Sequence, residues 1–138
     1  MTRVRLNIQR NRAAIQGFKK LVKEKADMIE AEIEASAFDI RSQAVTTVPV
    51  DTGILKGSIR VVPVGHKLHK IIEAGAHYAP YIEFGTGALV NVPSGLEDYA
   101  IQFKGKGVKQ VNLPARPFLI PAWEQERLKL VERIRKQL

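Results

Sequence analysis

The chain of 138 residues contains no cysteine and a single tryptophan. The lack of cysteine excludes disulfides, thiolate metal sites and a cysteine nucleophile. No apolar run approaches the roughly 20 residues that cross a bilayer, and no apolar stretch follows the N-terminal arginines as it would in a secretory signal. These absences favour a protein of a reducing compartment, or of a particle assembled in one, with no membrane partner.

The composition nevertheless supports a folded core. Hydrophobic residues make up 45% of the chain, and a chain of this length buries about 68% of its unfolded surface on folding. We therefore expect one domain that spans residues 1–138.

Positive charge is concentrated at the N-terminal end. The whole chain carries a net charge of +8. Its first 25 residues hold eight basic residues against one glutamate, a net of +7: Arg3, Arg5, Arg10, Arg12, Lys19, Lys20, Lys23 and Lys25. Within the basic arm, residues 1–11, alternating apolar residues favour a short edge strand or a segment that orders only against a partner. The arm could meet nucleic acid, an anionic lipid surface or an acidic protein face, or it could be a solvated segment that aids solubility.

From Arg12 onward the apolar residues adopt helical spacing. They recur at intervals of four and seven: Phe18, Val22, Ile29, Ile33, Ile40 and Ala44. Pro49 prevents the helix from continuing past Val48. A helix of about 33 residues would be about 50 Å long, which exceeds the needs of a small core. Part of its apolar stripe is therefore expected to pack on another subunit.

The centre of the chain predicts short elements. We expect a helical turn from Gly53 to Ser58, capped by Asp51 or Thr52. Residues 59–64 and 68–74 predict two strands that form a hairpin, and residues 78–84 predict a helical turn that closes on Gly85.

The C-terminal part combines a loose region with a helix. Residues 88–112 are expected to form a variable basic insert, and residues 108–113, at its C-terminal end, predict a strand. Residues 123–138 predict a helix with Trp123, Leu130, Val131 and Ile134 toward the core. The expected fold class is α+β, with a long N-terminal helix and a C-terminal helix packed on a small, mostly antiparallel sheet.

A stiff strip, residues 114–122, precedes the last helix. Its three prolines each fix φ and remove a backbone donor, and each pushes the preceding residue toward extended geometry. Such a strip suits a docking surface better than a reaction centre.

No arrangement of residues indicates catalysis, a cofactor or a metal. The three histidines, His66, His69 and His77, do not have the spacing of a metal motif. The segment 85–87 lacks the remainder of a phosphate-binding loop. Asp51 and Glu83 are not evidently paired as acid and base, and capping of a turn is the better interpretation of Asp51.

Six residues are candidates for an interface: Tyr78, Tyr81, Phe84, Arg116, Pro117 and Phe118. Tyr78, Tyr81 and Phe84, which are spaced three residues apart, form either a hydrophobic plug or a contact patch. Arg116 is either a partner in a rim salt bridge or an interface anchor. The candidates for contact with DNA or an acidic surface are Arg3, Arg5, Arg10, Arg12, Lys104, Lys106 and Lys109, although the three lysines also suit a solvated loop.

Three segments occur in a recognisable order after the long helix. They are Pro49-Val50-Asp51-Thr52-Gly53-x-Leu55-Lys56-x-Ser58-Ile59, then Tyr78-Ala79-x-Tyr81-Ile82-Glu83-Phe84-Gly85-Thr86, then Pro114-Ala115-Arg116-Pro117-Phe118-Leu119-x-Pro121-Ala122. This order resembles the small neck and tail-completion proteins of tailed phages, the head–tail joining family of HK-type siphophages and prophages. The resemblance extends from about residue 18 to residue 138, except for the insert.

The resemblance implies a non-enzymatic virion protein, assembled in the host cytoplasm, that forms a ring of copies of itself. Six copies are expected from the sixfold symmetry of phage tails. The implied partners are the phage connector or adaptor and the tail terminator or tail tube proteins, with passing DNA contacted non-specifically. Asp51, Thr52 and Gly53 would form a conformational corner, and Tyr81, Glu83 and Phe84 a packing corner. Arg116, Pro117 and Phe118 would order the start of the last element. The alternative function is a small basic nucleic-acid-binding protein, which the charge suggests but no binding motif supports.

Overall fold

The computed structural model describes residues 12–87, 90, 92–100 and 112–138. Its first element, helix α1, spans Arg12–Thr47 and is 36 residues long, which corresponds to about 54 Å. The amide of Val48 still donates to the carbonyl of Ala44 at 2.9 Å. Pro49 follows, and the helix ends where the sequence predicted.

A short helix and a hairpin follow α1. Helix α2 (Ile54–Ser58) leads into strand β1 (Ile59–Pro63), which pairs antiparallel with β2 (Lys70–Ala74), Ile59 lying opposite Ala74. The predicted hairpin is confirmed. The predicted capping of α2 by Asp51 or Thr52 is wrong, because the N-cap is Gly53 and no side chain caps the helix. Gly53 has φ +80°, a left-handed conformation that glycine adopts without steric cost.

The described chain after the hairpin consists of helices joined by irregular segments. Helix α3 (Ala79–Phe84) closes on Gly85 as predicted, whereas the single turn α4 (Glu97–Ala100) was not predicted. Helix α5 spans Leu119–Gln137 and so begins four residues before the predicted start. Pro121 lies in its first turn, where a missing backbone donor breaks no helical hydrogen bond.

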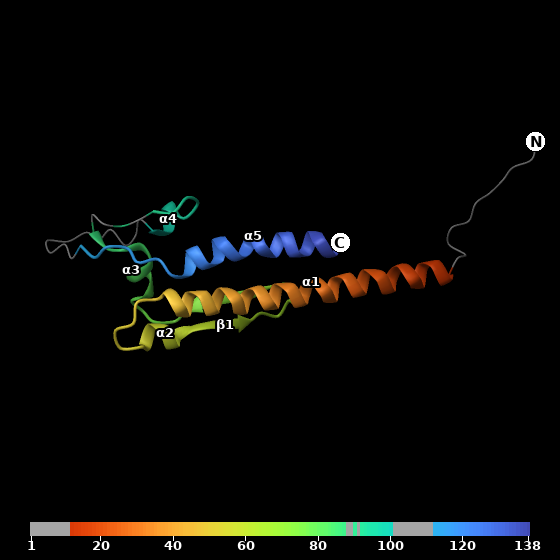
Figure 1. Cartoon of the computed structure of the whole chain (residues 1–138), viewed down its shortest axis with the longest axis horizontal. Helices are drawn as coiled ribbons and strands as arrows, with labels where there is room; N and C mark the ends of the chain where they lie inside the picture. Colours follow the sequence, from red (N-terminus) through yellow and green to blue (C-terminus); the bar gives the residue numbers. More distant parts are fainter. Residues whose placement is uncertain (1–11, 88–89, 91, 101–111) are drawn as a thin grey trace, which may run out of the picture.

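Helix α1 lies between the β1–β2 hairpin and α5 (Figure 1). The core forms around its C-terminal half and consists of Ile40, Ala44, Val48, Leu55, Ile59, Ala79, Phe118 and Ala122. The N-terminal part of α1, before Lys25, extends past the end of α5 (Figure 1). Two terminal helices and a two-stranded antiparallel sheet confirm the α+β class.

The orientation of α5 differs in part from the prediction. Trp123 and Val131 are 49% and 47% exposed, so their placement toward the core is wrong, while Leu130 and Ile134 are half-buried. Glu126 faces inward instead, with 2% of its surface exposed. The predicted strand-like arm, and residues 101–111 of the predicted insert, lie outside the described residues.

Candidate functional site

Helix α3 holds the proline strip, residues 114–122, whose last four residues lie within the start of α5 and not before it. The amide of Arg116 donates to the carbonyl of Ile82 at 2.8 Å. Farther along, the amide of Thr86 donates to the carbonyl of Leu113 at 3.0 Å, and the Leu113 amide donates to the Thr86 hydroxyl at 2.9 Å. The second and third sequence segments, separated by the insert, are thus joined by backbone pairing.

Glu83 anchors the start of α5. Its Oε2 accepts hydrogen bonds from the amides of Phe118 at 2.9 Å and Leu119 at 3.0 Å, and its Oε1 accepts from the amide of Ile120 at 2.9 Å. The first amides of a helix have no partner within the helix, and a carboxylate at this end also interacts favourably with the helix dipole. A buried carboxylate from α3 therefore supplies the cap that α5 lacks in its own sequence.

This role of Glu83 was not predicted from the sequence. The signal was present in two places. Glu83 is the single charged residue in the otherwise apolar turn 78–84, and α5 begins without a serine, threonine, asparagine or aspartate at its N-cap, which is Phe118. A helix start without a local cap has backbone amides that require an acceptor, and a carboxylate in an apolar turn requires hydrogen-bond donors. Each supplies what the other lacks.

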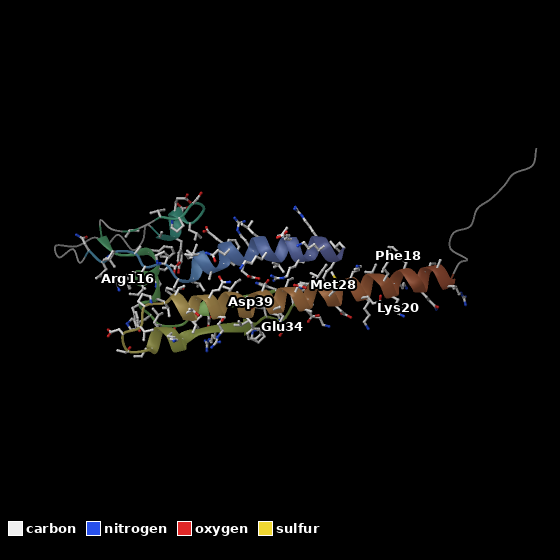
Figure 2. The ribbon with its side chains drawn as sticks, in the orientation of Figure 1. Phe18, Lys20, Met28, Glu34, Asp39 and Arg116 are labelled. Atoms are coloured by element: carbon white, nitrogen blue, oxygen red, sulfur yellow. The ribbon has the colours of Figure 1, made fainter. Side chains whose placement is uncertain are left out.

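The first sequence segment meets the third at a surface hollow. Residues 51–53 line this hollow together with Tyr78, Ile82 and Arg116. Figure 2 shows Arg116 near the C-terminal end of α1, on the strip that leads into α5. The three segments that the sequence analysis singled out therefore converge at one end of the molecule.

The six interface candidates have different environments in the isolated chain. Arg116 and Pro117 are exposed, Tyr81 is 42% exposed, and Tyr78 is half-buried. Phe84 and Phe118 are buried, with 4% and 2% of their surface exposed, and thus serve the core of the subunit. Only the exposed members present an accessible surface in this state, and an interface role for any of the six stays a prediction.

Of the basic candidates, Arg12 is exposed at the start of α1. The others, Arg3, Arg5, Arg10, Lys104, Lys106 and Lys109, lie outside the described residues. Within the described part of the chain, no group of three histidine, aspartate or glutamate side chains is placed to hold a metal ion. No described helix is long and apolar enough to cross a membrane.

A polar cluster joins α1 to α5. Arg133 donates to Glu126 Oε1 and to Glu32 Oε2, both at 2.8 Å. Ser36 donates to Glu126 Oε1 at 3.0 Å, and Gln137 donates to Glu32 Oε1 at 2.6 Å. The hydrogen bonds from Arg133 and then Gln137 lower the pKa of Glu32, and those to Glu126 and Glu32 raise the pKa of Arg133. The cluster fixes how the two helices align.

Beyond this cluster, the apolar stripe of α1 is uncovered. Near the end of α5, Lys25 Nζ donates a hydrogen bond to the carbonyl of Gln137. Closer to the N-terminus, four large apolar side chains are 41% to 67% exposed: Ile15, Phe18, Leu21 and Val22. Ile15, Phe18 and Val22 lie on the same helical face as the buried Ile40 and Ala44. The stripe thus continues for about 20 Å past the part of the molecule that covers it.

Comparison with known proteins identifies the family of this chain. A family model described as "Bacteriophage HK97-gp10, putative tail-component" matches residues 12–85, from the start of α1 to the glycine that closes α3. Neither the curated proteins nor the solved structures gave a significant match. The family match gives no support to the alternative of a nucleic-acid-binding protein. More than half of the chain matches, and the protein belongs to the HK97-gp10-like family of bacteriophage tail components.

Proposed function

We propose that this protein is a ring-forming neck component, a head–tail joining or tail-completion protein that links the connector to the tail. As a member of a tail-component family, the chain is a part of the virion. The observation that carries the finer proposal is the uncovered stripe of α1. Apolar side chains at helical spacing on one exposed face are typical of a surface that is buried on association.

The proposed assembly is a closed ring of identical subunits, formed in the host cytoplasm. When one surface of each subunit contacts a different surface of the next, the subunits form a ring if the rotation between neighbours closes after a whole number of copies. Six copies match the sixfold symmetry of the tails that such a ring would join. The phage connector or adaptor would lie on one side of the ring and the tail terminator or tail tube protein on the other.

The basic N-terminal segment supports a second feature of the proposal. A net charge of +7 over the first 25 residues would attract either the phosphates of DNA that passes through the ring or an acidic face of a neighbour. DNA contact of this kind would be non-specific and would weaken as salt concentration rises.

The direct test is the mass of the particles that the purified protein forms. Mass photometry is done on the full chain alone and with tail tube, terminator or connector proteins, at low and at high salt. A discrete ring, alone or in the presence of one of these partners, is the expected outcome. A monomer that ignores all of them, but binds free duplex DNA with a steep salt dependence, would overturn the proposal in favour of nucleic-acid binding.

A further inference from the structure

The N-terminal and central parts of α1 carry net charges of opposite sign. Residues 12–25 hold five basic residues against Glu24, a net of +4, whereas residues 26–40 hold five acidic residues and no basic one, a net of −5. Each of these parts, the basic half and the acidic half, is about 21 Å long. The uncovered apolar stripe lies on the basic half, and the acidic half runs alongside α5 (Figure 2).

The acidic half has an outer face that could accept a helix. Phe38 is 53% exposed on this face, and the exposed Ala31 and Ala35, one helical turn apart, lie next to it. Glu34 and Asp39 flank Phe38 and are also exposed. Among the described residues, neither carboxylate has an ion pair within the subunit. An aromatic side chain beside two alanines offers a groove that admits a large apolar side chain.

The basic half carries the complementary features. Phe18 is 67% exposed and Val22 is 53% exposed, one helical turn apart and matched in spacing to the alanine pair. Lys19 and Lys23 lie along one edge of this stripe, and no other described residue forms an ion pair with them. The two surfaces pair large with small and positive with negative.

We propose that the basic half of α1 in one subunit docks on the outer face of the acidic half of α1 in the next subunit. This interface rests on the proposed ring function and names the surfaces that form the ring. The stripe and the outer face lie on opposite sides of α1, so one subunit uses the first toward one neighbour and the second toward the other. Such a contact is heterologous and propagates around a ring.

The geometry of a ring is compatible with this contact. A sixfold axis rotates neighbouring copies by about 60°, so neighbouring α1 helices cross at no more than this angle. A crossing of about 50° is the commonest arrangement for helices that interlock through ridges of residues four apart. The pairs 18 and 22 on one helix and 31 and 35 on the next are ridges of this kind.

Charge reversal with complementation tests the interface. The full-length variants K19E/K23E and E34K/D39K each place like charges across it, and each is expected to raise the subunit concentration for half-assembly at least about tenfold. An equimolar mixture is expected to assemble again, because alternating subunits then have opposite charges at every contact. The variant K20E/K129E has the same change of net charge as K19E/K23E, outside the interface, and is expected to assemble like the unaltered protein.

A second comparison tests the apolar part of the contact. Phe18→Ala is expected to raise the half-assembly concentration at least about tenfold, as for a central interface residue. Leu128→Ala, which truncates a side chain that is 65% exposed on α5, is expected to have little effect. Circular dichroism melting checks that every variant keeps the fold of the subunit.

The outcomes separate this interface from the ring itself. If the unaltered protein forms rings and both reversal variants form them equally well, the interface is wrong and the ring function stands. If the reversal variants fail and their mixture also fails, the charges do not face each other and the interface is again overturned. If the unaltered protein forms no ring with any tail or connector partner, the proposed function itself fails.

Discussion

The capping of α5 by Glu83 predicts a large loss of stability when its carboxylate is changed. In Glu83→Gln one carboxylate oxygen is replaced by an NH₂ group, whose N–H donors would face the backbone N–H donors at the start of α5. Three backbone amides share the carboxylate, at 2.9, 3.0 and 2.9 Å. Loss of a helix cap costs about 0.5–2 kcal/mol, and hydrogen bonds to a charged group each contribute about 1.5–3 kcal/mol.

Because these contributions overlap, we expect Glu83→Gln to lower the free energy of unfolding by about 3 kcal/mol. A domain of this size loses about 3–5 °C of melting temperature per kcal/mol, so the midpoint is expected to fall by about 10 °C. Differential scanning calorimetry measures this shift at a fixed protein concentration, at which any assembly is held constant.

The control is Glu124→Gln, an exposed position on α5, the helix that Glu83 caps, where a change within about 0.5 kcal/mol is expected. Amide hydrogen exchange gives a local readout, since protection at Phe118, Leu119 and Ile120 is expected to fall more than protection in α1. A melting temperature within 1 °C of the unaltered protein, with unchanged protection at these amides, would refute the capping argument.

Three further predictions concern the helix cluster and the turn before α2. Hydrogen bonds lower the pKa of Glu32, so its contribution to stability is present above the ordinary carboxyl pKa near 4.5 and is lost as pH falls through the lowered value. In a plot of melting temperature against pH, the decrease on the acid side (the acid limb) is therefore expected to be less steep in Glu32→Gln. Arg133→Ala leaves the carboxylate of Glu126 buried with one fewer donor and is expected to cost about 2–3 kcal/mol in urea denaturation, toward the low end for a broken buried pair because the guanidinium is partly exposed. Gly53→Ala places a Cβ at φ +80° and is expected to cost about 1–2 kcal/mol, whereas Gly57→Ala, within α2, is expected to stabilise by up to about 1 kcal/mol.

The outcomes that contradict these predictions are equally specific. An acid limb that is as steep in Glu32→Gln as in the unaltered protein would show that another group governs it. Arg135→Ala serves as the control for Arg133→Ala, since Arg135 is exposed on the same helix. Equal losses of stability in the two variants would show that the polar cluster does not stabilise the fold. In neither glycine position does an added Cβ meet an atom within 4 Å, so equal effects there would contradict the backbone argument.

Much of the fold could be predicted because its signals are local. The period of the apolar residues predicted α1, Pro49 predicted its end, and the turn at residues 65–67 predicted the hairpin. Gly85 predicted the end of α3. Each of these signals lies within a few residues of the structure that it determines.

The anchor of α5 could not be predicted in the same way, because its partners are far apart in sequence. The bonds of Glu83 join residues 35 to 37 positions apart, and no periodic pattern reports such a pairing. The orientation of α5 failed for a related reason. Its inner face carries Glu126 and Arg133, which pack through the polar cluster. The prediction from apolar residues alone therefore placed Trp123 and Val131 on the inner face, which was wrong.

The apolar periodicity of α1 extends over more of the helix than the isolated subunit covers. The same apolar period runs from Ile15 to Ala44, yet the subunit covers only its second half. Sequence periodicity reports that a face is to be buried and says nothing of which chain buries it. An isolated helix of about 13 residues is marginal in water, and here the projecting segment also exposes Phe18 and Val22. Both costs are relieved by the same event, the docking of this segment on another molecule. The change of charge sign between residues 25 and 27 favours a second copy as that molecule, because a single helix then carries both complementary surfaces.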